Sequence, residues 1–499
     1  MDATEPEPSL RSRCERIVFG RKVWSIYGSL VIHVLTILAL VPWSAVPSMP
    51  KRPMVIDLQF IDADDVGDAG GVLIDAGAEA FLEADTATDA TGLSATVESP
   101  ALDVTAPTMH SRPLPDAATV MAALATTAVT GSPSAAGEAG GRAGAIPHPA
   151  AAAYASRQGS ARGQSVAQNG GSAASEAAVE RGLEWLARHQ AADGSWRFDL
   201  SGCQCNGGCS FPGTVTSTTA ATGIALLPFL GAGYTHEQGK HRATVTQGLY
   251  YLMSRMQPTP RGGDLGEGTM YGHGVATLAL AEALGMTGDQ MLVSYVRDAV
   301  RFSETAQDLH GGGWRYLPGQ AGDTTVTAWQ LAALKSAALA GVPVPSPTID
   351  GVCRFLDRVQ VRHGEGYGYL APQDRPCTSA VGLLCRIYTA WPEVATIDRG
   401  LARLAKPGPG PEDVYQNYYL AQALLLRGHP AWKRWNARNR DLLVARQATW
   451  GHEAGSWAFA DADTRPGGRL GHTALAVLTL EVYYRILPLY GEAVAETGW

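Results

Sequence analysis

The chain has 499 residues, a formal net charge of -8 and a hydrophobic fraction of 45%. This length is enough for two or three domains with a large core, and the negative charge argues against a nucleic-acid partner. The 57 glycines and 30 prolines are many for a single compact domain, so we expect part of the chain not to be compact.

The N-terminal residues predict a membrane anchor. Residues 1–22 form a polar tail that ends in a basic cluster, and residues 23–43 contain no formally charged side chain. At about 1.5 Å per residue, residues 23–43 can cross a bilayer core of about 30 Å. Because the basic residues precede this stretch, we expect a cytoplasmic N-terminus and an exported remainder, in the periplasm or its equivalent. The alternative is a cleaved signal peptide, which the length of the apolar stretch disfavours.

Ser29 and His33 lie four residues apart in this stretch and would share one helix face. An ionisable side chain inside a membrane is costly and is therefore a functional candidate. The pair resembles the Ser-x-x-x-His element in the membrane helix of TonB-type energy transducers. This resemblance implies coupling to an energised partner complex in the inner membrane. The alternative is that Ser29 hydrogen-bonds to its own helix and that neutral His33 is merely tolerated.

Residues 44–172 are dominated by Ala, Gly, Ser, Thr, Pro and Asp, with few aromatic residues. Such a stretch cannot bury enough apolar surface to offset the entropy lost on ordering. We therefore expect a long disordered linker between the membrane helix and a domain that covers residues 173–499.

A repeated pattern organises this domain. Residues 311–334 combine a glycine turn, an aromatic-rich extended piece, a polar helix start and a run of helix formers. Thr219, His273 and Thr327 occupy equivalent positions at a spacing of 54 residues, which indicates an internal repeat. Single helical hairpins cannot bury both faces, so they are expected to stack side by side and close a ring. The six hairpins are expected at residues 175–231, 241–285, 291–340, 347–391, 396–428 and 432–488.

Residues 182–196, 311–329 and 455–461 resemble the Gln-Trp-type repeats of the prenyltransferase and squalene-cyclase superfamily, the terpenoid cyclase toroids. This resemblance implies an all-α fold, an (α/α)6 toroid of six helical hairpins around a central cavity. The fold alone does not define an activity, because the same fold carries several.

The superfamily has two chemistries, and each depends on a particular sequence element. Its protein prenyltransferases bind zinc through an Asp-x-Cys element, whose matching positions here are Asp323 and Thr325. A hydroxyl does not replace a thiolate on zinc, so we expect no metal or other cofactor there, and Asp323 to be a helix N-cap.

The class II cyclases of the superfamily use Asp-x-Asp-Asp. The nearest match keeps Asp461 and Asp463, with Asp463 as the candidate acid and His472 nearby. The alternative places both aspartates in a solvated loop.

Three cysteines, Cys203, Cys205 and Cys209, lie within seven residues of one another. They are close enough in sequence to bind a metal ion, with His236 or His241 as a further ligand. In an exported domain, however, thiols tend to be oxidised, so a disulfide is the favoured interpretation.

Aromatic and histidine side chains at the starts of the inner helices are candidates to line the cavity. These candidates are Tyr271, His273, Trp329, Tyr418 and His472. Such faces hold an apolar chain or stabilise a carbocation. Because the complete Asp-x-Asp-Asp and Asp-x-Cys elements are missing, we expect a module that binds an apolar, isoprenoid or peptide-like ligand without turnover. The alternative is an enzyme similar to class II terpene cyclases.

Overall fold

The computed structural model describes residues 154–205 and 207–486. The expected cytoplasmic tail, the stretch that contains Ser29 and His33, and residues 44–153 of the expected linker lie outside these ranges. Among the residues that are described, none of the helices combines the length and the apolar character that crossing a membrane requires.

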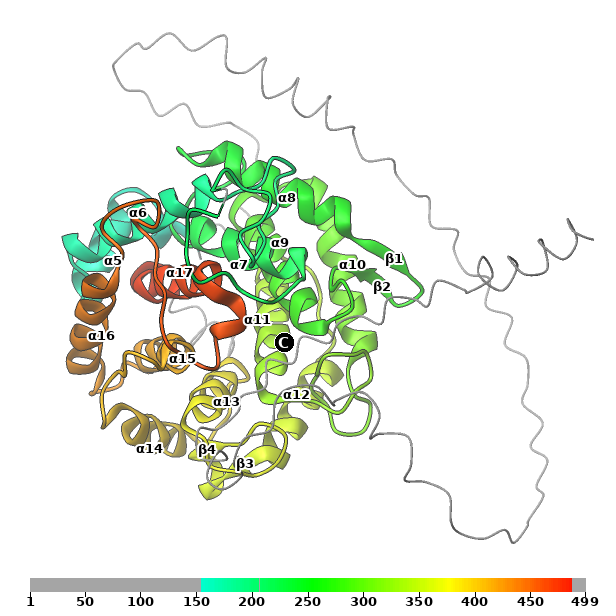
Figure 1. Ribbon diagram of the computed structural model, residues 1–499. Coiled ribbons are helices and arrows are strands. Elements are labelled where there is room, and N and C mark those ends of the chain that lie inside the picture. Colours follow the sequence, from blue (N-terminus) through cyan, green and yellow to red (C-terminus); the bar gives the residue numbers. More distant parts are fainter. Residues whose placement is uncertain (1–153, 206, 487–499) are drawn as a thin grey trace, which may run out of the picture. The chain divides into compact units, whose positions relative to one another are not determined.

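The described part of the chain is a ring of helices in two layers (Figure 1). The inner layer consists of α7 (Thr218–Gly231), α9 (Met270–Thr287), α11 (Thr324–Leu339), α13 (Pro376–Tyr388), α15 (Val414–Leu426) and α17 (Gly468–Leu480). The outer layer consists of α6 (Ala173–Arg188), α8 (Arg242–Arg255), α10 (Gln290–Ala306), α12 (Ser346–Val359), α14 (Val394–Ala405) and α16 (Trp432–Arg446). Each inner helix contacts the next one along the chain, and α17 contacts α7. The ring therefore closes, and the expected toroid of six hairpins is present.

Burial explains why these helices occupy two layers. Every residue of α7 from Thr219 to Gly231 is buried, as an inner helix between neighbours requires. The outer helix α12 instead buries one stripe, which includes Ile349, Val352 and Leu356. This spacing of three and four residues marks an amphipathic helix with a polar outer face.

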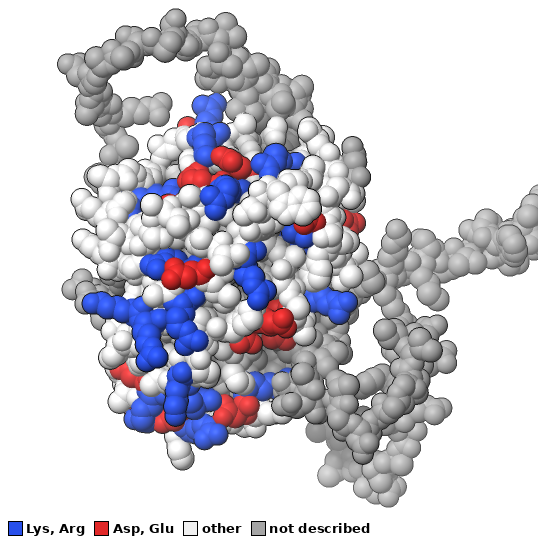
Figure 2. Space-filling model, turned by 60° about the vertical axis from the view of Figure 1, so that its left-hand side comes forward, with Lys and Arg blue, Asp and Glu red and all other residues white. Residues whose placement is uncertain are grey.

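Short elements complete the ring. The β-strands β1 (Gln257–Thr259) and β2 (Gly262–Asp264) form one antiparallel hairpin, and β3 (Gln360–Val361) and β4 (Gly366–Tyr367) form another. The helices η3 (Arg362–Gly364), η4 (Arg465–Gly467) and α18 (Val482–Arg485) lie in connections or follow α17. On the face that Figure 2 shows, basic and acidic side chains are interspersed rather than separated by sign.

The repeated aromatic residues lock each turn against the following inner helix. The backbone N–H groups of Trp196, Trp314, Tyr367 and Trp457 donate to the side-chain oxygens of Thr222, Thr327, Ser379 and Thr473 respectively, at 2.9–3.1 Å. The indole N–H groups of the three tryptophans donate to backbone carbonyls of the preceding outer helices, at 2.7–2.8 Å. The 54-residue spacing predicts Thr219 as the equivalent position in the first repeat. The residue that accepts this hydrogen bond is instead Thr222, one helical turn later.

The prediction of a disordered linker is wrong for residues 154–172. The helices η2 (Ala155–Arg157) and α5 (Gly159–Asn169) pack on the ring. Arg157 is 1% exposed and its Nη1 lies 2.7 Å from Glu282 Oε2 on α9. The domain therefore begins at or before residue 154. Composition misses this because the order of the segment comes from a buried partner 125 residues away.

Candidate functional site

A cavity of about 60 Å³ lies at the centre of the ring, where several inner helices begin. We call it the central cavity. It is lined by Phe198, Val215, Ala220, Ile224, Tyr271, Val275, Trp329, Tyr415, Asp463, Thr464, Gly467, Gly471 and Leu475. Most of these side chains are apolar or aromatic, so the walls favour an apolar occupant over water.

Trp329 is the centre of an aromatic wall of this cavity. Its indole Nε1–H donates to the hydroxyl oxygens of Tyr271 and Tyr415, both at 2.9 Å. Its ring stacks on Tyr418 at a centroid distance of 6.1 Å and meets the edge of Tyr419 at 6.2 Å. The hydrogen bonds and ring contacts hold these side chains in fixed positions.

The tyrosines of this wall remain neutral near pH 7. Burial raises the pKa of both Tyr271 and Tyr415. Of the expected cavity residues, Tyr271 and Trp329 do line the central cavity, whereas Tyr418 lies behind Trp329 and is not part of the lining. Tyr415 was missed by the sequence reasoning, although its place at the start of an inner helix is the same signal that selected Tyr271.

Asp461 is a buried capping residue. Its Oδ2 accepts the backbone N–H groups of Val414 and Tyr415 at 3.0 and 3.4 Å, and its Oδ1 accepts that of Asp463 at 2.8 Å. These bonds hold the start of α15, the helix that supplies Tyr415. Burial raises the pKa of the Asp461 carboxyl. The alternative of a solvated loop is therefore wrong for Asp461, which is 4% exposed.

Asp463 differs from Asp461 because it is one of the residues that line the central cavity. It lies next to the half-buried Cys377, whose thiol pKa is raised by desolvation and by the nearby carboxylates of Asp463 and Asp461. Asp463 is therefore the carboxylate that the described residues place on the cavity wall.

His472 is fully buried and both of its ring nitrogens are engaged. The backbone N–H of Phe459 donates to Nδ1 at 3.1 Å, so Nε2 carries the proton and donates to Thr464 Oγ1 at 2.8 Å. Burial, together with the positive charge of Arg469, lowers the pKa of His472 to about 4. His472 does not line the cavity. It fixes the loop between residues 459 and 464 and has no free nitrogen for a substrate.

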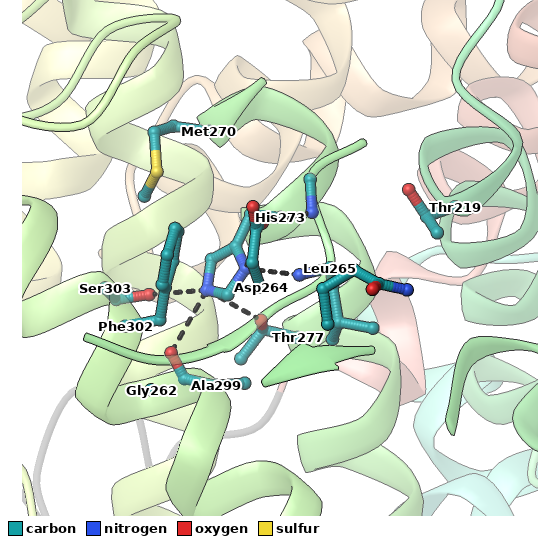
Figure 3. A network of polar contacts seen from close by, with 12 residues as sticks. Thr219, Gly262, Asp264, Leu265, Met270, His273, Thr277, Ala299, Phe302 and Ser303 are labelled. Carbon is teal, nitrogen blue, oxygen red and sulfur yellow. Dashed lines mark hydrogen bonds and ion pairs between the residues drawn. The ribbon is translucent and has the colours of Figure 1, made fainter. Parts of the chain in front are cut away.

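His273 plays the same structural role in another repeat, because both of its ring nitrogens are engaged by neighbouring groups (Figure 3). The backbone N–H of Leu265 donates to Nδ1 at 3.1 Å, and Nε2 lies 3.1 Å from both Ala299 O and Ser303 Oγ on α10. Burial lowers the pKa of His273 to about 4, although the Asp264 carboxylate opposes this shift. Its expected place in the cavity is wrong, because His273 is not among the lining residues and its ring ties the residue after β2 to α10.

Asp323 is the N-cap of α11, as the sequence predicts. Its Oδ1 accepts the backbone N–H groups of Thr325 and Val326 at 2.9 and 2.8 Å. Burial raises the pKa of the Asp323 carboxyl to about 6.

The cysteine cluster divides into two parts. The ligand atoms of Cys205 and Cys209 lie within 4.8 Å of those of His189 and His452, and Cys203 is not in this group. Each of these three cysteines is a free thiol in this structure, so the favoured disulfide is not formed. The two histidines that were expected as further ligands are elsewhere. His236 pairs with Asp289 at 3.0 Å, and His241 packs against Phe229 and Tyr234.

No known family model matches this chain, and no curated protein matches it either. Solved structures with a similar fold include the GH76A alpha-1,6-mannanase of Salegentibacter sp. HEL1_6, at 10% identity and a TM-score of 0.43, covering 62% of this chain and 99% of that chain. A D-mannose isomerase is similar at 13% identity and a TM-score of 0.45, with 64% and 99% of the two chains covered. The type II terpene cyclase MstE from Scytonema is similar at 13% identity and a TM-score of 0.40, with 62% and 97% covered.

These similarities concern helical toroids with several activities, so the terpenoid cyclases that the sequence resembles are one group among others. At these scores and identities the comparison carries no conclusion about activity or substrate.

Proposed function

We propose that the toroid is a binding module that holds a small apolar group in the central cavity. The observation that carries this proposal is the combination of a mainly apolar lining with a volume of about 60 Å³. At about 10–15 Å³ per water-sized position, this volume corresponds to about four to six waters. An aromatic ring or a branched five-carbon unit is of that size, so the occupant is the end of an isoprenoid or an apolar side chain of a peptide.

The surroundings of the cavity support binding without turnover. Asp461 is committed to the start of α15, and His472 uses both nitrogens within its own loop. A general acid or base must be able to reach the atom that gains or loses the proton, and these groups are already engaged.

A size series tests the proposal. The full chain is titrated with 3-methylbut-2-en-1-ol, which has one isoprenyl unit, and with farnesol, which has three, and the melting temperature is followed. We expect the short alcohol to raise the melting temperature and farnesol to add little to that rise, because ligand binding to the folded state stabilises it. A melting temperature that neither alcohol raises would show that the cavity does not bind such groups.

Asp463 supports a second candidate function, that of an enzyme similar to class II terpene cyclases. It lines the central cavity, where a general acid would have to be. The volume argues against long substrates, since ligand pockets usually measure about 300–1,000 Å³. Incubation with squalene and shorter polyprenyl compounds separates the two functions. Cyclised product that disappears in Asp463→Asn, with substrate still bound, would establish the enzyme.

We also propose that residues 23–43 anchor the protein with the N-terminus in the cytoplasm and the toroid exported. The uncharged stretch and the preceding basic cluster support this proposal. In the same arrangement Ser29 and His33 would face an inner-membrane partner. Reporter fusions after residue 60 and at the C-terminus are expected to give an exported signal at both points.

A further inference from the structure

The first and last hairpins of the ring meet through two loops. The loop between α6 and α7 contains Cys205 and Cys209, and the loop between α16 and α17 contains His452. His189, at the C-terminal end of α6, lies beside both loops. These four side chains come from positions up to 263 residues apart, yet their ligand atoms all lie within 4.8 Å of one another.

The spacing of these atoms matches a tetrahedral metal site. His189 Nε2 lies 3.3 Å from Cys209 Sγ, and the same sulfur lies 3.3 Å from His452 Nδ1. Zinc–sulfur bonds of about 2.3 Å and zinc–nitrogen bonds of about 2.0–2.1 Å place neighbouring sulfur and nitrogen ligands about 3.5 Å apart. These two pairs are therefore within a few tenths of an ångström of the expected separation, and all four ligand atoms lie within 4.8 Å of one another.

The hydrogen bond of His189 leaves the correct nitrogen free for a metal ion. Its Nδ1 lies 2.7 Å from the backbone carbonyl of Trp185, to which only a protonated Nδ1 can donate. Nε2 then presents a lone pair toward Cys209. Metal-binding histidines usually donate their other N–H to a carbonyl or carboxylate in this way. The ring also stacks on Trp185 at a centroid distance of 3.9 Å, which fixes its plane.

The cysteine loop is folded to bring its two thiols together. The backbone N–H of Gly208 donates to Cys205 O at 2.8 Å, which closes a tight turn. A Cβ atom on Gly208 would lie 3.0 Å from that carbonyl and 3.3 Å from the His452 ring. Glycine at this position therefore lets the two loops approach closely.

The cluster also has a compensating positive charge and a second link between its loops. Arg469 is 4% exposed, and its Nε donates to Ser210 O at 2.8 Å while Nη2 pairs with Glu453 Oε2 at 3.0 Å. These bonds join the residue after Cys209 to the residue after His452. Without any ion, the loops are thus already held in the arrangement that binding requires.

We propose that His189, Cys205, Cys209 and His452 form a Cys2His2 zinc site that fastens the last hairpin of the ring to the first. Tetrahedral sites of two sulfurs and two nitrogens are typical of zinc. Four protein ligands leave no open position, so the site is structural and is separate from the central cavity. On binding, two Zn–S bonds form and the two thiol protons pass to solvent. This assignment replaces the disulfide that the sequence favours. The spacing of the cysteines does not show that His189 and His452 lie beside them in the fold.

Elemental analysis of the purified full chain tests the site. We expect one zinc per wild-type chain and a loss of that zinc in Cys209→Ser. Cys203→Ser is the matched control, because the Cys203 thiol donates to Leu200 O and is outside the group. This control should keep its zinc. A wild-type chain without zinc, or a Cys203→Ser chain that loses it as fully as Cys209→Ser, would overturn the proposal.

Three further measurements keep the test decisive if Cys209→Ser fails to fold. His452 is exposed, so His452→Ala should fold, and it should lose its zinc to a chelator concentration that leaves the wild type loaded. In cobalt-substituted wild-type chain, we expect the absorption of tetrahedral Co²⁺ with thiolate charge-transfer bands.

Thiol labelling under denaturing conditions distinguishes the zinc site from a disulfide. Cys205 and Cys209 should react once a chelator is added without a reductant, whereas reaction only after reduction would contradict the zinc site.

Discussion

At the residue scale, burial decides which titratable side chains are available for chemistry. His472 has the position of a catalytic residue in the sequence, yet its pKa of about 4 and its two hydrogen bonds make it a neutral structural group. Asp461 and Asp463 are two residues apart, and one holds a helix start while the other reaches the cavity. Residue type and spacing alone therefore do not separate these roles.

The buried His472 predicts a loss of stability in acid. Its pKa is about 4 in the folded chain and about 6.5 when unfolded, so between these values the unfolded state binds more protons. Its contribution is therefore complete above pH 6.5 and is lost as the pH falls toward 4, by an amount on the order of 3 kcal/mol. Urea unfolding at pH 7 and pH 4.5 measures this. We expect the free energy of unfolding of His472→Asn to change less between the two pH values than that of the wild type. An equal change in both proteins would show that His472 is not the group responsible.

At the element scale, the sequence predicts the hairpins well because each one repeats the same local signals. Trp196, Trp314 and Trp457 follow glycine turns, and their indoles lock each turn to the preceding outer helix. What the repeat cannot predict is contact between distant elements. The helix α5, the placement of His189 beside Cys209 and the small volume of the cavity all depend on side chains that are far apart in the sequence.

The packing of η2 and α5 predicts a large effect of removing Arg157. Its guanidinium and that of Arg485 both pair with the buried Glu282 carboxylate. Removing one partner of a buried charge network typically costs about 3–5 kcal/mol, because a buried charge is left less compensated. We expect Arg157→Ala to lower the free energy of unfolding by about 3 kcal/mol and to increase hydrogen exchange in residues 159–169.

The matched control for Arg157 is Arg197→Ala. Arg197 pairs with Asp193 at the surface, at 3.5 Å. Exposed pairs of this kind contribute about 0–1 kcal/mol. If the two substitutions had equal effects, the N-terminal segment would not be part of the folded ring.

At the scale of the whole molecule, the closed ring has two separate features. The first turns of several inner helices line the central cavity, and the loops of the first and last hairpins meet at the proposed zinc site. The ring closes through contacts of α17 with α7 and with α6 as well. Loss of zinc is therefore expected to lower the melting temperature while the helical content at low temperature remains.

The central claim is that the cavity itself binds a small apolar group, and a glycine on its wall provides the sharpest test. Gly471 lies in α17, and a Cβ atom there would meet only Phe198, at 3.8 Å. Gly471→Val therefore has room within the fold, and valine is no worse than glycine in a helix. The added atoms would occupy space that the ligand needs. In contrast, Gly163 in α5 has no atom within 4 Å of its added Cβ, so Gly163→Ala is the matched control away from the cavity.

The decisive measurement is the dissociation constant of 3-methylbut-2-en-1-ol for the wild type, Gly471→Val and Gly163→Ala, all as full chains in the same buffer. Nonspecific partitioning is the same for all three proteins and cancels in the comparison. The account predicts that Gly471→Val keeps its stability but weakens binding at least about tenfold, which is about 1.4 kcal/mol, while Gly163→Ala binds like the wild type. Equal affinity in all three proteins would contradict it, because the bound group would then lie outside the central cavity.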